Sequence, residues 1–437
     1  MEKILLIGNG AREHAIAESV IKFEYELYGF MSAKNPGIAK LCNECKGSYK
    51  IGNILDAESA VHFAKDLNAD AVIIGPEAPL EAGVSDKFLE NEIPCISPTK
   101  SLARLETSKE FARNLMKEYH INAYPKFEIF KSNEIKEMFK FIDDLQDVAV
   151  KPIGLTGGKG VKVTGKQLNN AEEAKTYAGE ILKNDKVVLI EEKLEGEEFT
   201  LQAFCDGENL ASCPLVQDHK SAYENDVGPN TGGMGSYSDK NLMLPFVTRK
   251  DYKDALGNLK KVINVLKKDY GNYIGILYGQ FIATKDGVQI IEFNARFGDP
   301  EALNVLPLIK DNWIEKILDK KLSSGLKFEN KATVCKYLVP AGYPENPLKT
   351  EISVDESKFE NNSKIYYANV YEENKKIFSA HSRAIALLGI AETIEEAEKI
   401  AENSTKFVKG NLYHRQDIGT KELINKRLEH IKRIKNV

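Results

Sequence analysis

The residues best suited to chemistry stand at the end of one short segment, QIIEFNARFGDPE at residues 289–301. Gln289–Ile291 is predicted to be a buried strand that ends in Glu292 and Asn294. Side chains two positions apart lie on the same face of a strand, so a carboxylate and an amide are presented together, with Arg296 next on the same alternation. A hard cation such as Mg²⁺ prefers oxygen ligands and shares them with nucleotide phosphates. The pattern indicates a metal site beside a guanidinium, although a strand that merely ends in a polar turn would look the same in isolation.

Two lysines upstream of this segment are placed to meet anionic groups. Lys109 is expected in the first turn of a helix that opens with a capping box from Thr107 to Glu110, where a cation is unfavourable beside the helix dipole. Lys151 stands in the otherwise apolar strand VAVKP, and a buried lysine is costly unless a partner is present. Both positions indicate contact with an anion, although a solvated lysine explains Lys109 equally well.

A glycine-rich loop, GLTGGKGVKV at residues 154–163, follows Lys151. It contains no G-K-[ST] and leads into a strand rather than a helix, which excludes a P-loop. Gly157, Gly158 and Lys159 suit a flap whose backbone amides and lysine fold over phosphates. A hairpin turn with an incidental lysine is the alternative.

The apolar strand VVLI that comes next ends in residues that suit a nucleotide. Backbone groups of Glu191, Glu192 and Leu194 are expected at an open strand edge, where they can hydrogen-bond adenine. Glu198, on the strand after the next turn, is placed to reach a ribose. Gln280 lies on a later strand, GILYGQFIAT, which is expected to pair with the strand that ends in Glu292.

The N-terminal segment KILLIGNGAREHAIAESVIK predicts a buried strand and a helix joined by Gly8, Asn9 and Gly10. These glycines allow close approach of a ligand, and the helix N-terminus offers free amides to an anion. A dinucleotide site is excluded on two counts, because Glu13 replaces the third glycine of G-x-G-x-x-G and no acid follows the strand at about 25–30. We expect a phosphate or small-substrate site on a Rossmann-like unit.

A later strand of the same unit, DAVII, ends in Gly75, Pro76 and Glu77. Ligands of open parallel sheets gather at the carboxyl ends of the strands, so these residues are expected at the same site.

A stretch of about thirty residues without periodicity runs from Cys213 to Tyr237. In a compact domain such a long loop is typically functional or disordered. Its polar and glycine-rich content suits the lining of a substrate pocket with backbone amides. The residues concerned are Asp218, His219 and Lys220, followed by Asn230, Thr231, Gly232 and Gly233 within GPNTGGMG at 228–235.

Composition narrows the class of protein. The 437 residues are 42% hydrophobic and 29% charged, as in ordinary globular proteins, and this length predicts about two to four domains. A formal net charge of -5 argues against a nucleic-acid partner. Without a long apolar run or a signal peptide, we expect a cytoplasmic protein with no membrane partner. The six cysteines match no zinc pattern, and a redox role for Cys42 and Cys45 stays open but unassigned.

The order of the elements predicts an α/β chain in three parts. Residues 1–104 form a Rossmann-like N-terminal domain, residues 105–325 a central domain that contains the flap, and residues 326–437 a small α+β domain.

These features together resemble the ATP-grasp superfamily, in which nucleotide lies between two α+β subdomains. Within it, the chain resembles the phosphoribosylamine–glycine ligase family, also called glycinamide ribonucleotide synthetases, from Ile4 to about Gly419. The motifs that carry the resemblance are the N-terminal glycine loop, GPEAPL, LEGEEFT, QDHK, GPNTGGMG, EFNARFGDPE and HRQDIG. Two segments depart from the family pattern, GLTGGKG in the flap and SRA at 382–384, and neither removes a charged group.

The resemblance implies ATP-dependent ligation of glycine to 5-phosphoribosylamine through glycyl phosphate, with Mg²⁺ or Mn²⁺, small-molecule partners only and a monomeric chain. The segment from about 123 to 192 would be a mobile lid. Lys109, Lys151 and Lys159 would hold phosphates, and Gln280 would join Glu292 and Asn294 at the metal. Arg296, Lys159 and Asp218 would serve catalysis. The residues that would bind glycine and phosphoribosylamine are Gly8, Asn9, Gly10, Glu13, Gly75, Pro76, Glu77, Asp218, Lys220, Asn230, Thr231, Gly232, Gly233, Arg296, Gly298 and Asp299.

Three rival functions remain at this point. Another ATP-grasp ligase or a carboxylase that activates bicarbonate shares the fold, but its usual loops do not match QDHK or GPNTGGMG. An NAD(P)-dependent oxidoreductase conflicts with Glu13. A nucleotide sensor without catalysis would not need Glu292, Asn294, Lys151 and Arg296 together.

Overall fold

The structure is a computed structural model that describes residues 2–155 and 160–436. The predicted flap residues Gly157, Gly158 and Lys159 lie outside the described residues. No helix within the described ranges is both long and apolar enough to span a membrane.

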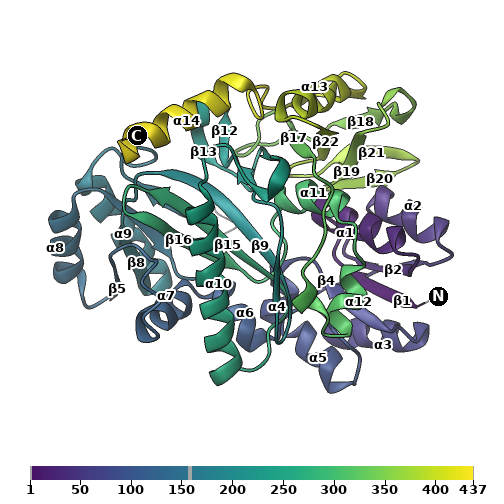
Figure 1. Ribbon diagram of the computed structural model, residues 1–437, viewed down its shortest axis with the longest axis horizontal. Coiled ribbons are helices and arrows are strands. Elements are labelled where there is room, and N and C mark those ends of the chain that lie inside the picture. The colour runs from purple at the N-terminus through teal and green to yellow at the C-terminus, as the bar shows by residue number, and fades with distance from the viewer. Residues whose placement is uncertain (1, 156–159, 437) are drawn as a thin grey trace.

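The N-terminal part is a four-stranded parallel sheet in the order β3-β2-β1-β4 (Figure 1). Apolar runs such as KILLI are typical of parallel strands that are covered on both faces. The Rossmann-like prediction is therefore confirmed. The elements are β1 (Lys3–Ile7), α1 (Ala11–Lys22), β2 (Glu26–Met31), α2 (Pro36–Glu44), β3 (Tyr49–Ile51), α3 (Ala57–Leu67), β4 (Ala71–Ile74), α4 (Glu77–Ala82), α5 (Val84–Glu90) and α6 (Lys100–Thr107).

The central part is built on an antiparallel sheet in the order β10-β9-β15-β16. β15 pairs with β16 as predicted, and Gln280 stands directly opposite Glu292. This pairing brings the two proposed metal residues together from neighbouring strands. The elements are α7 (Lys109–Glu118), β9 (Glu197–Asp206), β10 (Leu210–Ser212), α10 (Arg249–Asp269), β15 (Ile274–Thr284), β16 (Gly287–Asn294), α11 (Glu301–Val305) and α12 (Trp313–Leu318), with 3-10 turns η2 (Lys240–Leu242), η3 (Leu306–Leu308) and η4 (Leu322–Ser324).

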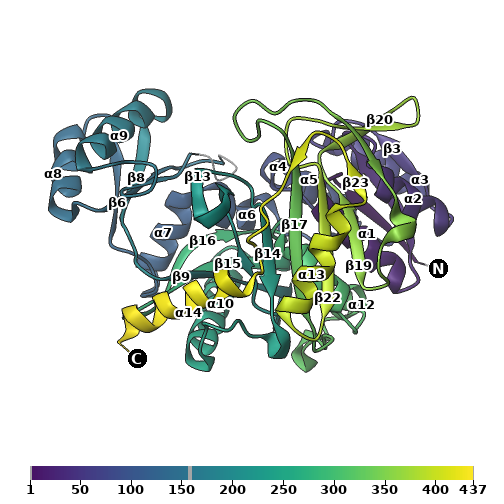
Figure 2. The same cartoon turned by 90° about the horizontal axis from the view of Figure 1, so that it is seen from above.

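The segment predicted to be a lid forms a lobe of its own with sheet order β5-β8-β6-β7. Figure 2 shows α8, α9, β6 and β8 standing apart from the remaining helices and sheets. The lobe has a separate hydrophobic cluster that includes Phe130, Met138, Ile142, Val150 and Ile190. Its elements are β5 (Phe127–Lys131), α8 (Ile135–Leu145), β6 (Val148–Pro152), β7 (Lys162–Val163), α9 (Ala171–Asp185) and β8 (Val187–Glu192).

The C-terminal part completes an antiparallel sheet in the order β11-β14-β17-β22-β19, with β24 paired to β17. Two of these strands, β11 and β14, come from the central part of the chain, so the sheet joins the two parts. The elements are β11 (Gln217–Asp218), β12 (Ser221–Tyr223), η1 (Glu224–Asp226), β13 (Val227–Asn230), β14 (Gly235–Ser238), β17 (Ala332–Pro340), β18 (Glu351–Val354), η5 (Glu356–Lys358), β19 (Ser363–Tyr367), β20 (Val370–Glu373), β21 (Lys376–Ser379), β22 (Ile385–Ala391), α13 (Ile394–Thr405), β23 (Val408–Lys409), β24 (Leu412–Tyr413) and α14 (Lys421–Lys435).

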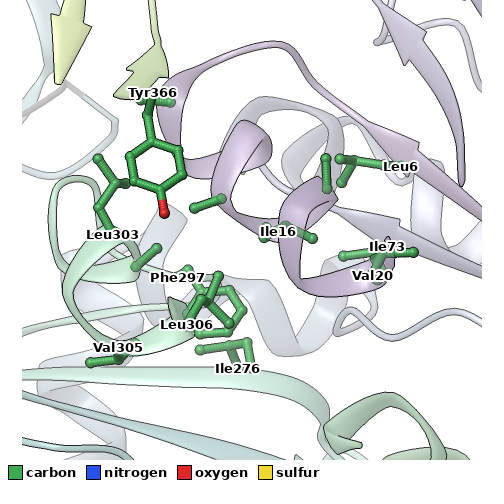
Figure 3. Close-up of a cluster of buried hydrophobic side chains, with 14 of the residues drawn as sticks. Leu6, Ile16, Val20, Ile73, Ile276, Phe297, Leu303, Val305, Leu306 and Tyr366 are labelled. Carbon is green, nitrogen blue, oxygen red and sulfur yellow. The ribbon is translucent and has the colours of Figure 1, made fainter. Parts of the chain in front are cut away.

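A hydrophobic cluster shared by the three parts fixes them to one another (Figure 3). Ile16 and Val20 of α1 belong to the same cluster as Phe297, Leu306 and the β19 residue Tyr366. Because apolar surface is buried across the boundaries, these parts form one body, whereas the lobe of β5–β8 keeps its own core.

Two local predictions are wrong. The helix at Lys109 is capped by Ser108, whose hydroxyl accepts from the Phe111 amide at 3.1 Å, because α6 continues through Thr107 and leaves Ser108 as the residue between the helices. The long loop before Tyr237 contains the short strands β11 to β14. These strands have too few residues to show the two-residue alternation of a β-strand in the sequence.

A fully buried lysine anchors the C-terminal sheet to α13. Lys336 of β17 donates to Glu398 and Glu402 at 2.6 Å each and to the Gln416 carbonyl at 2.8 Å. Burial alone would raise the pKa of Glu402, but hydrogen bonds with His414 and Lys336 outweigh it and lower that pKa to about 2. Glu402 is therefore ionised at neutral pH and holds the HRQDIG segment in place through Lys336.

We expect Lys336→Ala to lower the free energy of unfolding by about 3 kcal/mol, because it removes one member of a buried ion pair. Glu402 has a pKa below the usual 4.5 in the folded protein, so its share of the stability is present above that value and is lost as the pH falls toward 2. Urea unfolding followed by circular dichroism at pH 7 and pH 4 tests both statements. Lys399→Ala, which removes an exposed pair with Glu395, is the matched control and should change little. Equal effects of the two substitutions would contradict the assignment.

Candidate active site

A cavity of about 390 Å³ lies where the N-terminal part, the central sheet, the lobe and the C-terminal part meet. Many of the predicted residues line it, although they are scattered over more than two hundred positions of the sequence. These residues are Glu77, Lys109, Lys151, Glu191, Asp218, Lys220, Thr231, Gly232, Glu292, Asn294, Arg296, Gly298 and Asp299.

Glu292 of β16 lines the cavity, and the Gln280 oxygen of the neighbouring strand β15 shares a contact with it. Glu292 accepts from the Lys220 ammonium at 3.3 Å, and the Gln280 carbonyl oxygen accepts from the same ammonium at 2.5 Å. Burial alone would raise the pKa of Glu292, but Lys220, Lys151 and Lys109 outweigh it and lower that pKa to about 2. The carboxylate is therefore charged at neutral pH.

Asn294 completes this set of oxygen donors. In the orientation that gives its amide hydrogen-bond partners, the Asn294 nitrogen donates to Glu106 Oε1 at 3.2 Å and to the Phe293 carbonyl at 3.0 Å. The Asn294 side-chain oxygen then points away from these two acceptors. In the described ranges no three His, Cys, Asp or Glu side chains converge to form a closed metal site. One carboxylate and two amide oxygens fit a hard cation that takes its remaining ligands from water and phosphate.

Arg296 lies between two acids whose pKa values are shifted in opposite directions. Its Nη2 is 2.7 Å from Glu106 Oε1 and its Nε is 3.3 Å from Glu77 Oε2. Burial raises the pKa of Glu106 to about 7, although Arg296 opposes the shift. Burial would also raise the pKa of Glu77, but Arg296 and Arg12 outweigh it and lower that pKa to about 2. The guanidinium is thus held firmly at the cavity wall.

The prediction that Lys151 needs a partner is confirmed. Its ammonium lies 2.6 Å from Glu191 Oε2, and Arg113 Nε lies 2.5 Å from Glu191 Oε1. Arg113 also donates to the carbonyl of Ile291 on β16 at 2.7 Å. The Glu191 side chain therefore joins the lobe to the central sheet.

The prediction of an open strand edge at this point is wrong. β8 lies between β5, which pairs with residues 187–191, and β6, which pairs with residues 188–192, so each residue of the strand has a neighbour on at least one side. The amides of Glu192 and Lys193 donate to the carbonyls of Lys126 and Asp147. The strand ends after Glu192, so Leu194 lies beyond this pairing.

Two further residues predicted to contact the nucleotide are held by neighbours. Lys109 begins α7, as expected, and donates to the Gly154 carbonyl at the base of the flap at 3.0 Å. Burial lowers the pKa of Lys109. Glu198 accepts from the Gln280 amide at 2.6 Å and so sets the direction of the Gln280 oxygen.

Asp218 is a buried carboxylate at the cavity wall. Its Oδ1 has no hydrogen-bond partner within the described part of the chain. Burial raises its pKa well above the usual value, Glu301 adds to the shift, and Lys220 and Arg383 oppose it. A Cβ atom on Gly233 would lie 2.5 Å from this oxygen, so the glycine keeps the wall beside Asp218 free of a side chain.

The glycine-rich segment is fixed from the C-terminal part. Arg383 donates to the carbonyls of Gly232 at 2.7 Å and Gly233 at 3.0 Å, and its Nη2 lies 3.3 Å from Asp299 Oδ2. The Thr231 hydroxyl donates to the Lys220 carbonyl at 2.9 Å. Together these contacts hold the two predicted substrate loops against each other.

Two other predicted substrate residues have structural partners. Asn230 accepts from Gln167 of the lobe at 3.2 Å, which links the lobe to the substrate loop. Gly298 donates to Gln202 at 2.8 Å, and a Cβ atom on it would lie 2.3 Å from Glu301 Oε2.

The expectation of free amides at the N-terminal glycine loop is wrong for Gly10. Its amide donates to Glu13 Oε2 at 2.6 Å, so the carboxylate of Glu13 caps α1. Cβ atoms on Gly8, Gly10 and Gly75 would all lie within 2.7 Å of the Glu13 side chain. The glycines thus make room for Glu13 rather than for a ligand at this point.

Some described residues predicted for the site do not line the cavity. They are Gly8, Asn9, Gly10, Glu13, Gly75, Pro76, Glu192, Leu194, Glu198, Asn230, Gly233 and Gln280.

The cavity also contains residues that the sequence did not single out. Arg113 and Glu106 lie on amphipathic helices. In the sequence of such a helix, a charged residue that faces a binding site looks the same as one that faces solvent. Arg383 belongs to the SRA segment, and the departure of this segment from the family pattern was the one feature of the sequence that drew attention to it. Tyr278 lies within GILYGQFIAT and Glu301 ends EFNARFGDPE, and the two are joined by a hydrogen bond of 2.8 Å.

Comparison with known proteins extends over almost the whole chain. Three family models match, described as phosphoribosylglycinamide synthetase N domain at residues 2–106, ATP-grasp (A) domain at 107–302 and C domain at 333–421. The phosphoribosylamine–glycine ligase of Methanosarcina barkeri is 50% identical over 442 residues, covering 99% of this chain and 100% of that protein. The enzyme of the same name from Methanocaldococcus jannaschii is 49% identical over 447 residues, with 99% and 100% covered.

Solved structures agree with this result. The crystal structure of phosphoribosylamine–glycine ligase from Thermotoga maritima matches with a TM-score of 0.77 and 28% identity, covering 95% of this chain and 99% of that one. A biotin carboxylase from Campylobacter jejuni matches with a TM-score of 0.73 at 14% identity, covering 99% and 98%, which shows a shared fold. With its N, ATP-grasp and C domains all matched and relatives half identical over their full length, the chain belongs to the phosphoribosylglycinamide synthetase family.

Proposed function

We propose that the chain catalyses the ATP-dependent ligation of glycine to 5-phosphoribosylamine in purine biosynthesis, which yields glycinamide ribonucleotide, ADP and phosphate. Its full-length relatives bear the name of this reaction. One observation in the cavity carries the proposal. Asp218 Oδ1 is buried at the wall without a partner in the described residues, and a buried carboxylate that lacks a cation is costly. The ammonium of glycine supplies that cation.

The chemistry proceeds in two transfers. A carboxylate oxygen of glycine attacks the γ-phosphorus of ATP; the new O–P bond gives glycyl phosphate, and the bond to the leaving oxygen of ADP breaks. The amine of phosphoribosylamine then attacks the carbonyl carbon; a C–N bond forms, the C–O bond to phosphate breaks, and phosphate and a proton leave. Both steps require neutralised phosphoryl charge and aligned reactants. No covalent bond to the enzyme is needed, so no nucleophilic side chain is assigned.

We assign the nucleotide to the face of the cavity nearest the lobe. Lys109 and Lys151 hold phosphate oxygens in this proposal, and the flap residues Gly157, Gly158 and Lys159 cover them. Adenine lies against the backbone at the end of β8, from Glu191 and Glu192 to Leu194, and Glu198 reaches the ribose. Support comes from Lys109 and Lys151, which line the same cavity as Glu292 of β16.

We assign Glu292, Asn294 and Gln280 as the residues that hold Mg²⁺ or Mn²⁺. An ion held by these residues would neutralise charge on the transferring phosphoryl group. The low pKa of Glu292 supports this role, because the carboxylate is already ionised at neutral pH.

Glycine and phosphoribosylamine occupy the opposite face. Asp218 binds the ammonium of glycine, Arg296 steadies the acyl phosphate, and Lys220 with the 231–233 backbone lines the pocket. Glu77, Gly298 and Asp299 complete this wall. Gly8, Asn9, Gly10, Glu13, Gly75 and Pro76 stay predicted contacts of phosphoribosylamine from the adjoining loop.

The domain boundaries at 104 and 325, the lid from about 123 to 192, the monomeric state and the cytoplasmic location also stay predictions. The separate hydrophobic cluster of the lobe supports its movement as a unit.

The substrate assignment predicts that ADP release requires glycine and that bicarbonate does not replace it. Bicarbonate lacks an ammonium and would bring a like charge to the Asp218 carboxylate. Each 1.4 kcal/mol of lost binding free energy lowers the affinity about tenfold, so glycine should be strongly preferred. Coupled assays with Mg²⁺-ATP, phosphoribosylamine and either acid measure this preference. Asp218→Asn should raise the KM for glycine at least about tenfold, while Asp319→Asn, at an exposed pair, should not. Equal ADP release with bicarbonate would place the chain in carboxylase chemistry.

The metal assignment predicts that Glu292→Ala folds normally but loses most of its turnover, by about a hundredfold or more, because the phosphate charge would lack its strand carboxylate. Thermal unfolding and steady-state rates at several Mg²⁺ concentrations separate the two effects. Glu351→Ala on β18, which removes an exposed surface pair with Lys376, is the matched control. Turnover close to wild type for Glu292→Ala would refute the assignment.

The lid assignment predicts slower amide exchange in the lobe when ATP and Mg²⁺ bind. Lids of this kind close on a microsecond to millisecond timescale, and closure shields backbone groups from water. Hydrogen exchange with mass spectrometry should show protection at Gly154, Leu155, Gly160 and Val161, with little change in the distant helix α5. Unchanged exchange under saturating nucleotide would count against a moving lid.

A further inference from the structure

The ammonium of Lys220 contacts two of the oxygen atoms that we propose as metal ligands. It is 2.5 Å from Gln280 Oε1 and 3.3 Å from Glu292 Oε1. Gln280 cannot turn its oxygen away easily, because its amide nitrogen donates to Glu198 Oε2 at 2.6 Å. The contact is therefore set by β15, β16 and the loop that carries Lys220.

A metal ion on these oxygens would be close to the ammonium. A metal ion would lie about 2.1 Å from the Gln280 oxygen. Because the Lys220 ammonium is 2.5 Å from the same oxygen, the two cations would be within about 5 Å of each other. Like charges at that distance repel strongly in a partly desolvated site. The Lys220 and Glu292 side chains are 30% and 29% exposed, so the ammonium has room to leave.

We propose that Lys220 is a built-in competitor of the metal: its ammonium neutralises Glu292 and Gln280, and a divalent ion binds only as that ammonium is displaced. Lys220 is thus a positioning residue that acts through the metal ligands. The inference rests on the metal role proposed above for Glu292 and Gln280.

The competition has a consequence for the order of binding. A metal ion alone must displace Lys220 without compensation, so it binds weakly. Nucleotide phosphates bring negative charge that both cations can share, so metal and nucleotide enter together. Lys220 thereby makes occupation of the metal site depend on nucleotide.

Titration of the full-length protein with Mn²⁺ alone, followed by the electron paramagnetic resonance signal of free Mn²⁺, tests this directly. Lys220→Met should bind Mn²⁺ at least about tenfold more tightly than wild type without nucleotide, equivalent to about 1.4 kcal/mol. Lys220→Gln provides a second neutral variant if the first does not fold. Lys220→Arg keeps the cation and should restore weak binding. With a non-hydrolysable ATP analogue, the advantage of Lys220→Met should shrink.

Lys109→Met is the matched control, because Lys109 lines the same cavity but donates to Gly154 instead of to the metal residues. If the neutral Lys220 variants bind Mn²⁺ no more tightly than Lys109→Met does, the role of Lys220 is refuted, while the proposed metal site is not. Equal Mn²⁺ binding by wild type and Glu292→Ala in the presence of the analogue would overturn the metal site, and the inference with it.

Discussion

The layout of the cavity depends on the buried carboxylate of Glu191. It is 2% exposed and is held by Arg113 from α7 and by Lys151 from β6. Burial would raise the pKa of Glu191, but Arg113 and Lys151 outweigh it and lower it, so three charges stay paired away from water. Breaking such a group by removing one partner is strongly destabilising. Because Arg113 also donates to the carbonyl of Ile291 on β16, this contact joins the lobe to β16.

The remaining charges of the cavity are arranged in the same way. Arg296 is shared by Glu77 and Glu106, Lys220 faces Glu292, and Arg383 holds Asp299. Each of these three cations is held by an acid from another part of the chain, so their positions are set before any substrate arrives. Fixed charges of this kind stabilise a transition state without reorganisation during the reaction. Asp218 Oδ1, by contrast, has no hydrogen-bond partner in the described part of the chain, which is why we propose that it binds the cation of a ligand.

Much of the fold and of the site could be predicted from the sequence, because both depend on periodic patterns and local motifs. Glu292, Asn294 and Arg296 follow a strand alternation, and the structure brings all three to the cavity. The function of Glu13 could not be predicted, since its carboxylate folds back on Gly10 and only a structure shows what fills the space left by a glycine. Long-range contacts were likewise beyond sequence patterns. Arg113 and Glu191 meet across 78 positions, and nothing in either neighbourhood specifies the pairing.

The sheet that joins β11 and β14 to β17 limits how this enzyme family can be recombined. Gly235 on β14 pairs with Lys336 on β17, so the segment proposed to bind the acid substrate is joined to the C-terminal part of the chain. A chimera with a junction between these strands would leave a row of backbone groups unpaired beside the active site. The acid-binding loop and the C-terminal sheet must therefore be exchanged together, and in evolution they should have been inherited as one block.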